Sequence, residues 1–348
     1  MNFSVFFTNR CNMNCSYCYE KNKKECSMSY EIIDKTIDFI VSKKHENPTE
    51  KLSIVTHGGE PLLEFEKIKY FVSALKNRIE NVSYIITTNA TLLNDENIDF
   101  LIKNYAQISI SIDGNEKAHN SNRIFHNRRG SFDIVIQNSK KILDRAPFDI
   151  CARMTVNRKN VEYLFDGVKW LLDFGFVSIS PVPDQYDNNW TDSDMNELYN
   201  QGVQIIDYLK GYKGDCKVDL IDDALVRCMN SACDGGRTSF TIDTDGSIYP
   251  CLAAAGVSEF VIGSVDNGIN HESVERILEW AQAKNQACIG CSRYEYCDCT
   301  RCKIINKIYT GDLNTPIVAI CNIENVKIRL SQYYQKVFPN GQNALNKE

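Results

Sequence analysis

The sequence of 348 residues contains no apolar run long enough to span a membrane. It also lacks a secretory signal, because no charged segment followed by an apolar stretch and a small-residue cleavage site opens the chain. Positive charge is not in excess, since the formal net charge is −6, and nucleic-acid-binding surfaces are normally basic. Internal repeats and low-complexity tracts are absent. We therefore expect a cytoplasmic globular protein with neither membrane nor nucleic acid as a partner.

Cysteine, by contrast, is abundant, with fifteen residues. In a secreted chain this number would indicate disulfides, but nothing directs this chain to export, and a reducing cytosol keeps thiols reduced. The count is also odd, so complete pairing would leave one thiol over. Dense cysteine in a cytosolic protein indicates metal binding.

The first 211 residues alternate short apolar runs with amphipathic segments. Their spacing predicts strands at 3–8, 51–56, 82–87, 107–112, 149–156 and 176–183, and helices at 30–43, 65–79, 95–104, 132–145, 161–174 and 192–211. Six strand-then-helix units indicate a parallel sheet with right-handed crossovers. Periodicity alone leaves two α/β architectures open, an open doubly wound sheet and an incomplete version of the eight-unit barrel.

The pattern changes after about residue 213. Residues 238–250 predict a hairpin that turns at Asp245-Gly246, and a helix is expected near 322–336. The pieces around them are short, irregular and rich in cysteine, with no regular core in the pattern. We expect bound metal to replace apolar burial there.

Three cysteines, Cys11, Cys15 and Cys18, follow the first predicted strand within eight residues. A loop at the carboxyl end of a parallel strand is where α/β active sites form. A structural zinc site takes four protein ligands, whereas three thiolates on a four-iron cluster leave one iron open to a cofactor or substrate. The spacing favours the cluster, and zinc completed by a distant histidine or cysteine is the alternative.

The spacing C-x3-C-x2-C, with the aromatic Tyr17 before its third cysteine, resembles the signature of radical S-adenosylmethionine (SAM) enzymes. The resemblance implies that the open iron chelates the methionine part of SAM. Reduction by one electron, from a flavodoxin or ferredoxin type reductant, would then release a 5′-deoxyadenosyl radical. It also implies a partial (β/α)6 TIM-like barrel.

Further stretches resemble the family in the expected order. "HGGEP" (57–61) is similar to its SAM-amine motif, where Gly58 and Gly59 would permit close backbone approach and Glu60 would attract the ammonium group. By itself, a Gly-Gly pair after a strand is more often only a turn.

Two later stretches resemble ribose-side elements, "TTNATLL" (87–93) with Asn89 and "SISIDG" (109–114) with Ser111 and Asp113. Arg153 would pair with the SAM carboxylate, with an ordinary surface arginine as the alternative. Arg123 lies in a loop that the family also carries.

The cysteines of the second half fit zinc and iron–sulfur equally well when taken alone. Beside the first motif they resemble the SPASM extension, which implies two auxiliary [4Fe-4S] clusters and three in total. By position, the first would take Cys228, Cys233, Cys251 and either Cys299 or Cys302, of which we favour Cys302, and the second would take Cys288, Cys291, Cys297 and Cys321. Isolated thiols such as Cys151 are expected to be small buried apolar residues.

We therefore expect a radical SAM barrel over 1–190, a linking helix over 191–212 and a SPASM domain over 213–348. The resemblance implies a maturase of ribosomal precursor peptides, with a Cys thioether as the leading product and carbon–carbon cyclisation as an alternative. A sulfatase-maturing, formylglycine-forming enzyme is another alternative, although such relatives place an aspartate where Leu252 follows Cys251. A structural zinc-binding protein and a ferredoxin-like carrier are the non-enzyme alternatives.

Overall fold

The computed structural model of the chain describes residues 1–20, 25–225, 233–297 and 302–339. Its strands are β1 (Asn2–Thr8), β2 (Leu52–Gly58), β3 (Val82–Thr88), β4 (Gln107–Ser111), β5 (Cys151–Val156), β6 (Ser178–Pro183), β7 (Lys217–Val218), β8 (Ser239–Ile242), β9 (Ser247–Tyr249), β10 (Gly263–Ser264) and β11 (Gly268–Ile269). They form one sheet in the order β11-β10-β9-β8-β1-β2-β3-β4-β5-β6-β7. Strands β1 to β6 pair in parallel in chain order. The sheet stays open, so it forms a partial barrel.

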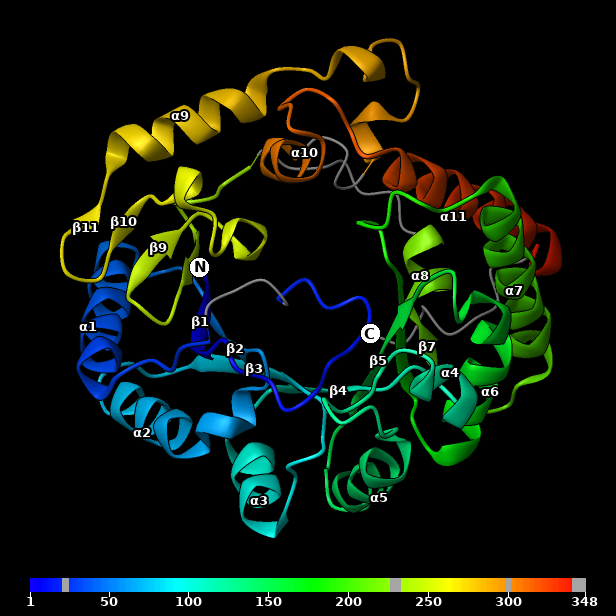
Figure 1. Ribbon diagram of the computed structural model, residues 1–348, viewed down its shortest axis with the longest axis horizontal. Coiled ribbons are helices and arrows are strands. Elements are labelled where there is room, and N and C mark those ends of the chain that lie inside the picture. The colour runs from blue at the N-terminus through cyan, green and yellow to red at the C-terminus, as the bar shows by residue number, and fades with distance from the viewer. Residues whose placement is uncertain (21–24, 226–232, 298–301, 340–348) are drawn as a thin grey trace.

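Helices follow the parallel strands and lie on the outside of the curved sheet (Figure 1). The α-helices are α1 (Tyr30–Glu46), α2 (Phe65–Lys76), α3 (Asp95–Asn104), α4 (Glu116–Asn120), α5 (Phe132–Leu143), α6 (Leu164–Phe174), α7 (Asp192–Gly211), α8 (Asp219–Leu225), α9 (His271–Gln282), α10 (Lys303–Thr310) and α11 (Val318–Val337). Short 3-10 turns cover Pro61–Glu64 (η1), Val161–Tyr163 (η2), Leu252–Ala254 (η3), Ser258–Phe260 (η4), Gln286–Cys288 (η5) and Tyr294–Tyr296 (η6). Side-chain caps fix several helix starts. At the start of α7, for example, the Thr191 side chain accepts a hydrogen bond from the Asp194 N–H, and the Thr191 N–H donates to the Asp194 carboxylate.

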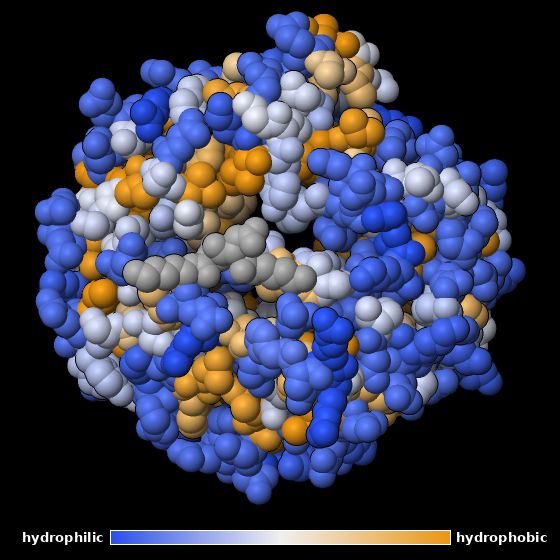
Figure 2. All heavy atoms as spheres, viewed as in Figure 1, coloured by the Kyte–Doolittle hydropathy of each residue, from blue (hydrophilic) through white to orange (hydrophobic). Residues whose placement is uncertain are grey.

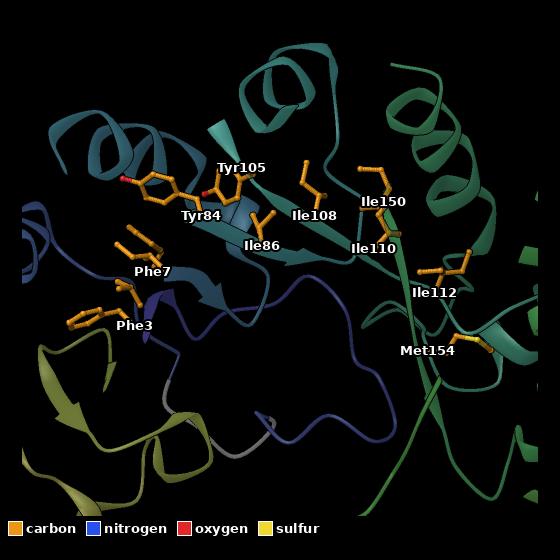
Figure 3. Packing of buried hydrophobic residues seen from close by; sticks show 14 of the residues in the cluster. Phe3, Phe7, Tyr84, Ile86, Tyr105, Ile108, Ile110, Ile112, Ile150 and Met154 are labelled. Atoms are coloured by element: carbon orange, nitrogen blue, oxygen red, sulfur yellow. The ribbon is translucent and has the colours of Figure 1, made fainter. Parts of the chain in front are cut away.

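The two faces of the sheet differ because side chains alternate along each strand. On β4, Ile108 and Ile110 are fully buried and point toward the surrounding helices (Figure 3). The opposite face carries small or polar residues, among them Ser109 and Ser111 of β4 and Arg153 of β5, which is paired with Ser111. The outer face therefore supplies the hydrophobic core, and the inner face of β4 and β5 carries small and polar side chains.

Short strands from the second half extend the same sheet at both sides. Strand β7 pairs in parallel with β6, and β8 pairs in parallel with β1. The predicted hairpin is confirmed, because β8 and β9 are antiparallel and Gly246 adopts φ +83° at the turn. The expectation that no regular core continues past residue 213 is wrong, since Phe240, Ile248 and Phe260 belong to the main hydrophobic core. Strands β7, β8 and β9 each contribute only one or two large apolar side chains, too few to form a periodic run.

In the part of the chain that the structure describes, every helix is too short or too polar to cross a lipid bilayer.

Candidate active site

The three thiols of the first motif lie on the loop that follows β1. This loop, dark blue in Figure 1, crosses the middle of the molecule inside the ring of helices. Cys11, Cys15 and Cys18 are each partly exposed and outside disulfides. The backbone N–H of Cys18 donates to the Cys15 carbonyl at 3.2 Å, and that of Met13 donates to the Cys11 sulfur at 3.4 Å. The loop thus presents all three sulfurs at the carboxyl edge of the parallel sheet.

Residues 122–125 hold the backbone between the thiols. The N–H of Asn14 donates to the carbonyl of Ile124 at 2.7 Å, and the N–H of Ser16 donates to the carbonyl of Asn122 at 3.0 Å. The Ser16 hydroxyl also donates to the Asn122 side chain, which is itself buried. Sequence reasoning missed Asn122, because an asparagine in a long loop carries no spacing signal.

Tyr17, Asp113 and Arg123 form a buried network behind the loop. The Tyr17 hydroxyl donates to one Asp113 oxygen at 2.6 Å. The other oxygen accepts from Arg123 Nε at 3.0 Å and from the N–H of Thr155 at 2.9 Å. The Arg123 guanidinium also lies 5.3 Å from the centre of the Tyr17 ring. Burial raises the pKa of Tyr17 well above its usual value, which keeps the phenol protonated as a donor.

These contacts differ from the ribose contact expected of Asp113. Asp113 is 1% exposed, and both of its oxygens accept hydrogen bonds from the protein. Arg123 donates a hydrogen bond from its Nε to Asp113, and one of its terminal nitrogens donates to the Arg153 carbonyl at 3.4 Å. In this structure Tyr17, Asp113 and Arg123 hold the cysteine loop on the ends of β4 and β5.

The glycines of "HGGEP" bring this segment against the cysteine loop. The N–H of Gly59 donates to the Thr8 carbonyl at 3.0 Å, and that of Glu60 donates to the Arg10 carbonyl at 2.9 Å. A Cβ at Gly59 would lie 2.4 Å from the Arg10 carbonyl oxygen, and one at Gly58 would lie 2.8 Å from that of Thr8. Both glycines therefore permit a close approach to residues 8–10 of the chain itself.

Replacing Gly59 with alanine is expected to cost about 1–3 kcal/mol of unfolding free energy, because the atom that the new Cβ meets is backbone and cannot rotate away. Gly211→Ala is the matched control. Gly211 ends α7 with open space around its Cβ position, so the same substitution should be neutral or slightly stabilising. Urea unfolding of the two variants measures the difference, and equal midpoints would show that the Gly59 contact relaxes without cost.

Glu60 and Asn89 connect three loops at the edge of the sheet. The Glu60 carboxylate is 1% exposed and accepts from the Thr88 hydroxyl at 2.7 Å and the Asn89 N–H at 2.8 Å. The Asn89 amide donates to Asn12 at 2.9 Å and lies 4.0 Å from the Cys11 sulfur. Burial raises the pKa of Glu60 to about 7. A group that binds there and donates a hydrogen bond, such as an ammonium, would favour the ionised carboxylate.

Ser111 and Arg153 lie on the inner face, as expected for ligand contacts. They pair across β4 and β5, and Arg153 is also paired with Ser180 of β6. The Arg153 residue is exposed, unlike the buried Arg123. Figure 2 shows that the face viewed in Figure 1 is hollowed near its centre. Ser111 is partly exposed.

Aromatic residues that no sequence motif indicated lie near the end of the cysteine loop, where Tyr19 interacts with Cys18 and Tyr186. The Tyr19 hydroxyl lies 3.3 Å from His57 Nε2. Tyr186, after β6, stacks on Tyr309 of α10 with ring centres 4.5 Å apart and planes 3° from parallel. Glu20 interacts electrostatically with both Tyr19 and Tyr309. Tyr19 and His57 adjoin recognised motifs and could have been suspected, whereas Tyr309 comes from a distant helix with no motif.

The donor set of the first motif suits a metal cluster. Burial, together with the nearby charges of Glu60, Cys15 and Cys18, raises the pKa of the Cys11 thiol to about 12. Such a thiol ionises only beside strong positive charge, as metal ions provide. A shallow pocket of about 430 Å³ gives access to it and is lined by Arg10, Cys11, Asn12, Glu25, Leu63 and His126. Within the described ranges, no group of three His, Cys, Asp or Glu side chains has an arrangement that could hold a single metal ion.

The cysteines of the second half fall into two groups. Cys251 is close enough to Cys302 and Cys233 for each to raise its pKa, after the larger effect of burial. Cys288 interacts in the same way with Cys291 and Cys321. Cys297 is partly exposed at the end of η6, whereas Cys228 and Cys299 lie outside the described residues. The structure thus brings three cysteines of each predicted ligand set near one another, and Cys302 is among those of the first.

Comparisons with known proteins bear on this arrangement. Residues 5–171 match the Radical SAM superfamily. The chain is 26% identical over 319 residues to the Cysteine-type anaerobic sulfatase-maturating enzyme of Clostridium novyi, covering 83% of this chain and 84% of that protein. It is also 26% identical over 290 residues to AlbA, the antilisterial bacteriocin subtilosin biosynthesis protein of Bacillus subtilis, covering 78% of this chain and 58% of AlbA.

A solved structure shares the fold over nearly the whole chain. It is that of native anSMEcpe with bound AdoMet and Kp18Cys peptide, with a TM-score of 0.76 and 16% identity, covering 97% of this chain and 100% of that one.

Proposed function

Residues 5–171 are a radical SAM domain and the chain is a radical SAM enzyme, and on this premise we propose that it modifies a ribosomally made precursor peptide by forming an intramolecular Cys thioether. The observation that carries the proposal is the three-thiol loop, which is held at the carboxyl edge of a partial barrel beside the polar inner-face residues of β4 and β5. The relatives and the similar solved structure support a peptide as the substrate, since AlbA is a biosynthesis protein of the bacteriocin subtilosin and anSMEcpe is seen with a bound peptide.

Different residues at the carboxyl edge of the sheet would hold the cluster and SAM. Cys11, Cys15 and Cys18 would bind three irons of a [4Fe-4S] cluster, and SAM would occupy the fourth position beside Glu60. When bound, the cluster and SAM supply a carbon-centred radical that abstracts hydrogen from the substrate. Arg153 would hold the SAM carboxylate as a charge-assisted contact from the inner face.

Thioether formation is an oxidation of the peptide. One hydrogen atom leaves carbon, one proton leaves the cysteine thiol, a sulfur–carbon bond forms, and one electron remains. The two thiol groups of the second half would hold the clusters that accept it, with Cys228, Cys233, Cys251 and Cys302 in one and Cys288, Cys291, Cys297 and Cys321 in the other. A cytoplasmic flavodoxin or ferredoxin type protein would supply the electron that starts each turnover.

A formylglycine-forming sulfatase maturase is the second candidate. It is favoured by the similarity to the C. novyi enzyme, which extends over most of both chains. The sequence after Cys251 weighs against it, because Leu252 stands where a carboxylate is expected and opens the turn η3. Both candidates take a cysteine-containing peptide, so the product distinguishes them.

The test is co-expression with a short cysteine-containing peptide encoded beside the gene, followed by mass spectrometry. We expect a loss of two hydrogen atoms for each cross-link, and a cysteine that no longer reacts with alkylating reagent. An aldehyde that traps a hydrazide probe would support the sulfatase candidate instead. An unmodified peptide, together with SAM cleavage by the same protein, would contradict the proposed substrate class.

A further inference from the structure

A lysine is buried between the two thiol groups of the second half. Lys303 is the first residue of α10, directly after Cys302, and is 4% exposed. Its ammonium donates to the side-chain oxygen of Asn285 and to that of Asn314, the latter at 2.8 Å. Lysine is among the residue types that are least often buried without a charged partner, so its position calls for a compensating negative charge.

Asn285 connects this lysine to the other thiol group. It is fully buried, its carbonyl accepts from the N–H of Cys288 at 3.0 Å, and its side chain bonds to the Cys288 thiol. Lys303 itself interacts electrostatically with Cys288. A short path therefore runs from Cys302 through Lys303 and Asn285 to Cys288.

The described surroundings supply little negative charge for the ammonium. Both of its described hydrogen-bond partners are neutral amides. The carboxylate that interacts with the ammonium belongs to Asp312, an exposed residue of the loop after α10. Thiolates that carry a metal cluster would be negatively charged and would lie on both sides of Lys303. The buried cation and the two thiol groups thus complement one another.

We propose that the buried positive charge of Lys303 raises the reduction potential of the cluster that Cys288, Cys291 and Cys321 would hold. The charge would thereby favour electron movement toward that cluster. This inference rests on the proposed function only in requiring metal clusters at these thiols. A fixed positive charge in a poorly hydrated region stabilises the reduced, more negative state of a neighbouring cluster more than its oxidised state.

The test is a potentiometric titration of the iron-loaded protein, followed by electron paramagnetic resonance. In Lys303→Met we expect one auxiliary midpoint to shift to a more negative potential, while the SAM-binding cluster and the iron content stay unchanged. Lys307→Met is the matched control, since Lys307 lies one turn further along α10 and donates to the Gly311 carbonyl. Its midpoints should equal those of the wild type.

Asn314→Asp provides a second variant in case Lys303→Met does not fold. It keeps the size and the hydrogen bond at an exposed residue and adds a negative charge beside Lys303, so the same midpoint should shift in the same direction by a smaller amount. Unchanged midpoints in both variants would overturn the proposal, as would loss of iron from them, which would make the role structural. A wild-type protein without auxiliary signals would also overturn it, whereas the proposed function is judged separately from the mass of the peptide.

Discussion

Replacing Cys15 with alanine should reduce the formation of 5′-deoxyadenosine from SAM to background. Its thiol is the middle one of the loop after β1, and the backbone around it is fixed by the hydrogen bonds of Asn14 and Ser16. No neighbouring thiol of the described loop can therefore move into its place without breaking those bonds. Two thiolates would leave the proposed cluster without one of its three protein ligands.

Cys26→Ala is the matched control for this experiment. Cys26 is also partly exposed and near the loop, but it contributes through its backbone carbonyl, which accepts from the Asn9 N–H at 2.9 Å and the Thr8 hydroxyl at 2.9 Å. Alanine keeps that carbonyl, so cleavage should persist. The measurement is anaerobic incubation of the reduced protein with SAM, with iron analysis alongside. Normal cleavage by Cys15→Ala would refute the three-thiol site.

The parallel half of the fold was predictable because its strands and helices are long enough to show their periods. Helix α7 covers Asp192–Gly211, the range that its pattern predicts. The elements that the sequence did not reveal are short or lie in the second half, such as β7 with two residues, α4 with five, and α10 with eight. Segments of this length contain fewer than three helical turns or strand repeats, so their apolar positions form no measurable period.

The site was predictable to the level of its loops but not of its side-chain roles. Motif order placed Cys11, Glu60, Asn89 and Arg153 at one edge of the sheet, and the structure brings them there. Motif order could not show that the Asp113 carboxylate would accept hydrogen bonds from Tyr17 and Arg123, because a polar residue at a strand end can face either a ligand or a neighbouring loop. That choice depends on long-range packing between residues 11–18 and 113–123.

Arg123→Met is expected to destabilise the protein far more than loss of an ordinary ion pair. Arg123 and Asp113 are both buried, with side-chain exposures of 8% and 0%. Removing one partner leaves a buried carboxylate with only the Tyr17 hydroxyl and the Thr155 N–H as donors, which typically costs about 3–5 kcal/mol. Because the same network carries the cysteine loop, SAM cleavage should fall as well.

The matched control is Arg145→Met, which removes an arginine that pairs with Asp95 at 3.0 Å and also with Asp99 on the surface of α3. Exposed pairs contribute about 0–1 kcal/mol, because water solvates the charges that remain. Urea unfolding of the metal-free proteins compares the two losses directly. Both variants replace an arginine with methionine, so their losses of unfolding free energy can be compared. A loss of about 3–5 kcal/mol in Arg123→Met alone would show that the cysteine loop depends on the buried network for its position. Similar midpoints would mean that water enters the site and solvates Asp113, and the loop would then be held by its backbone contacts to residues 122–125 alone.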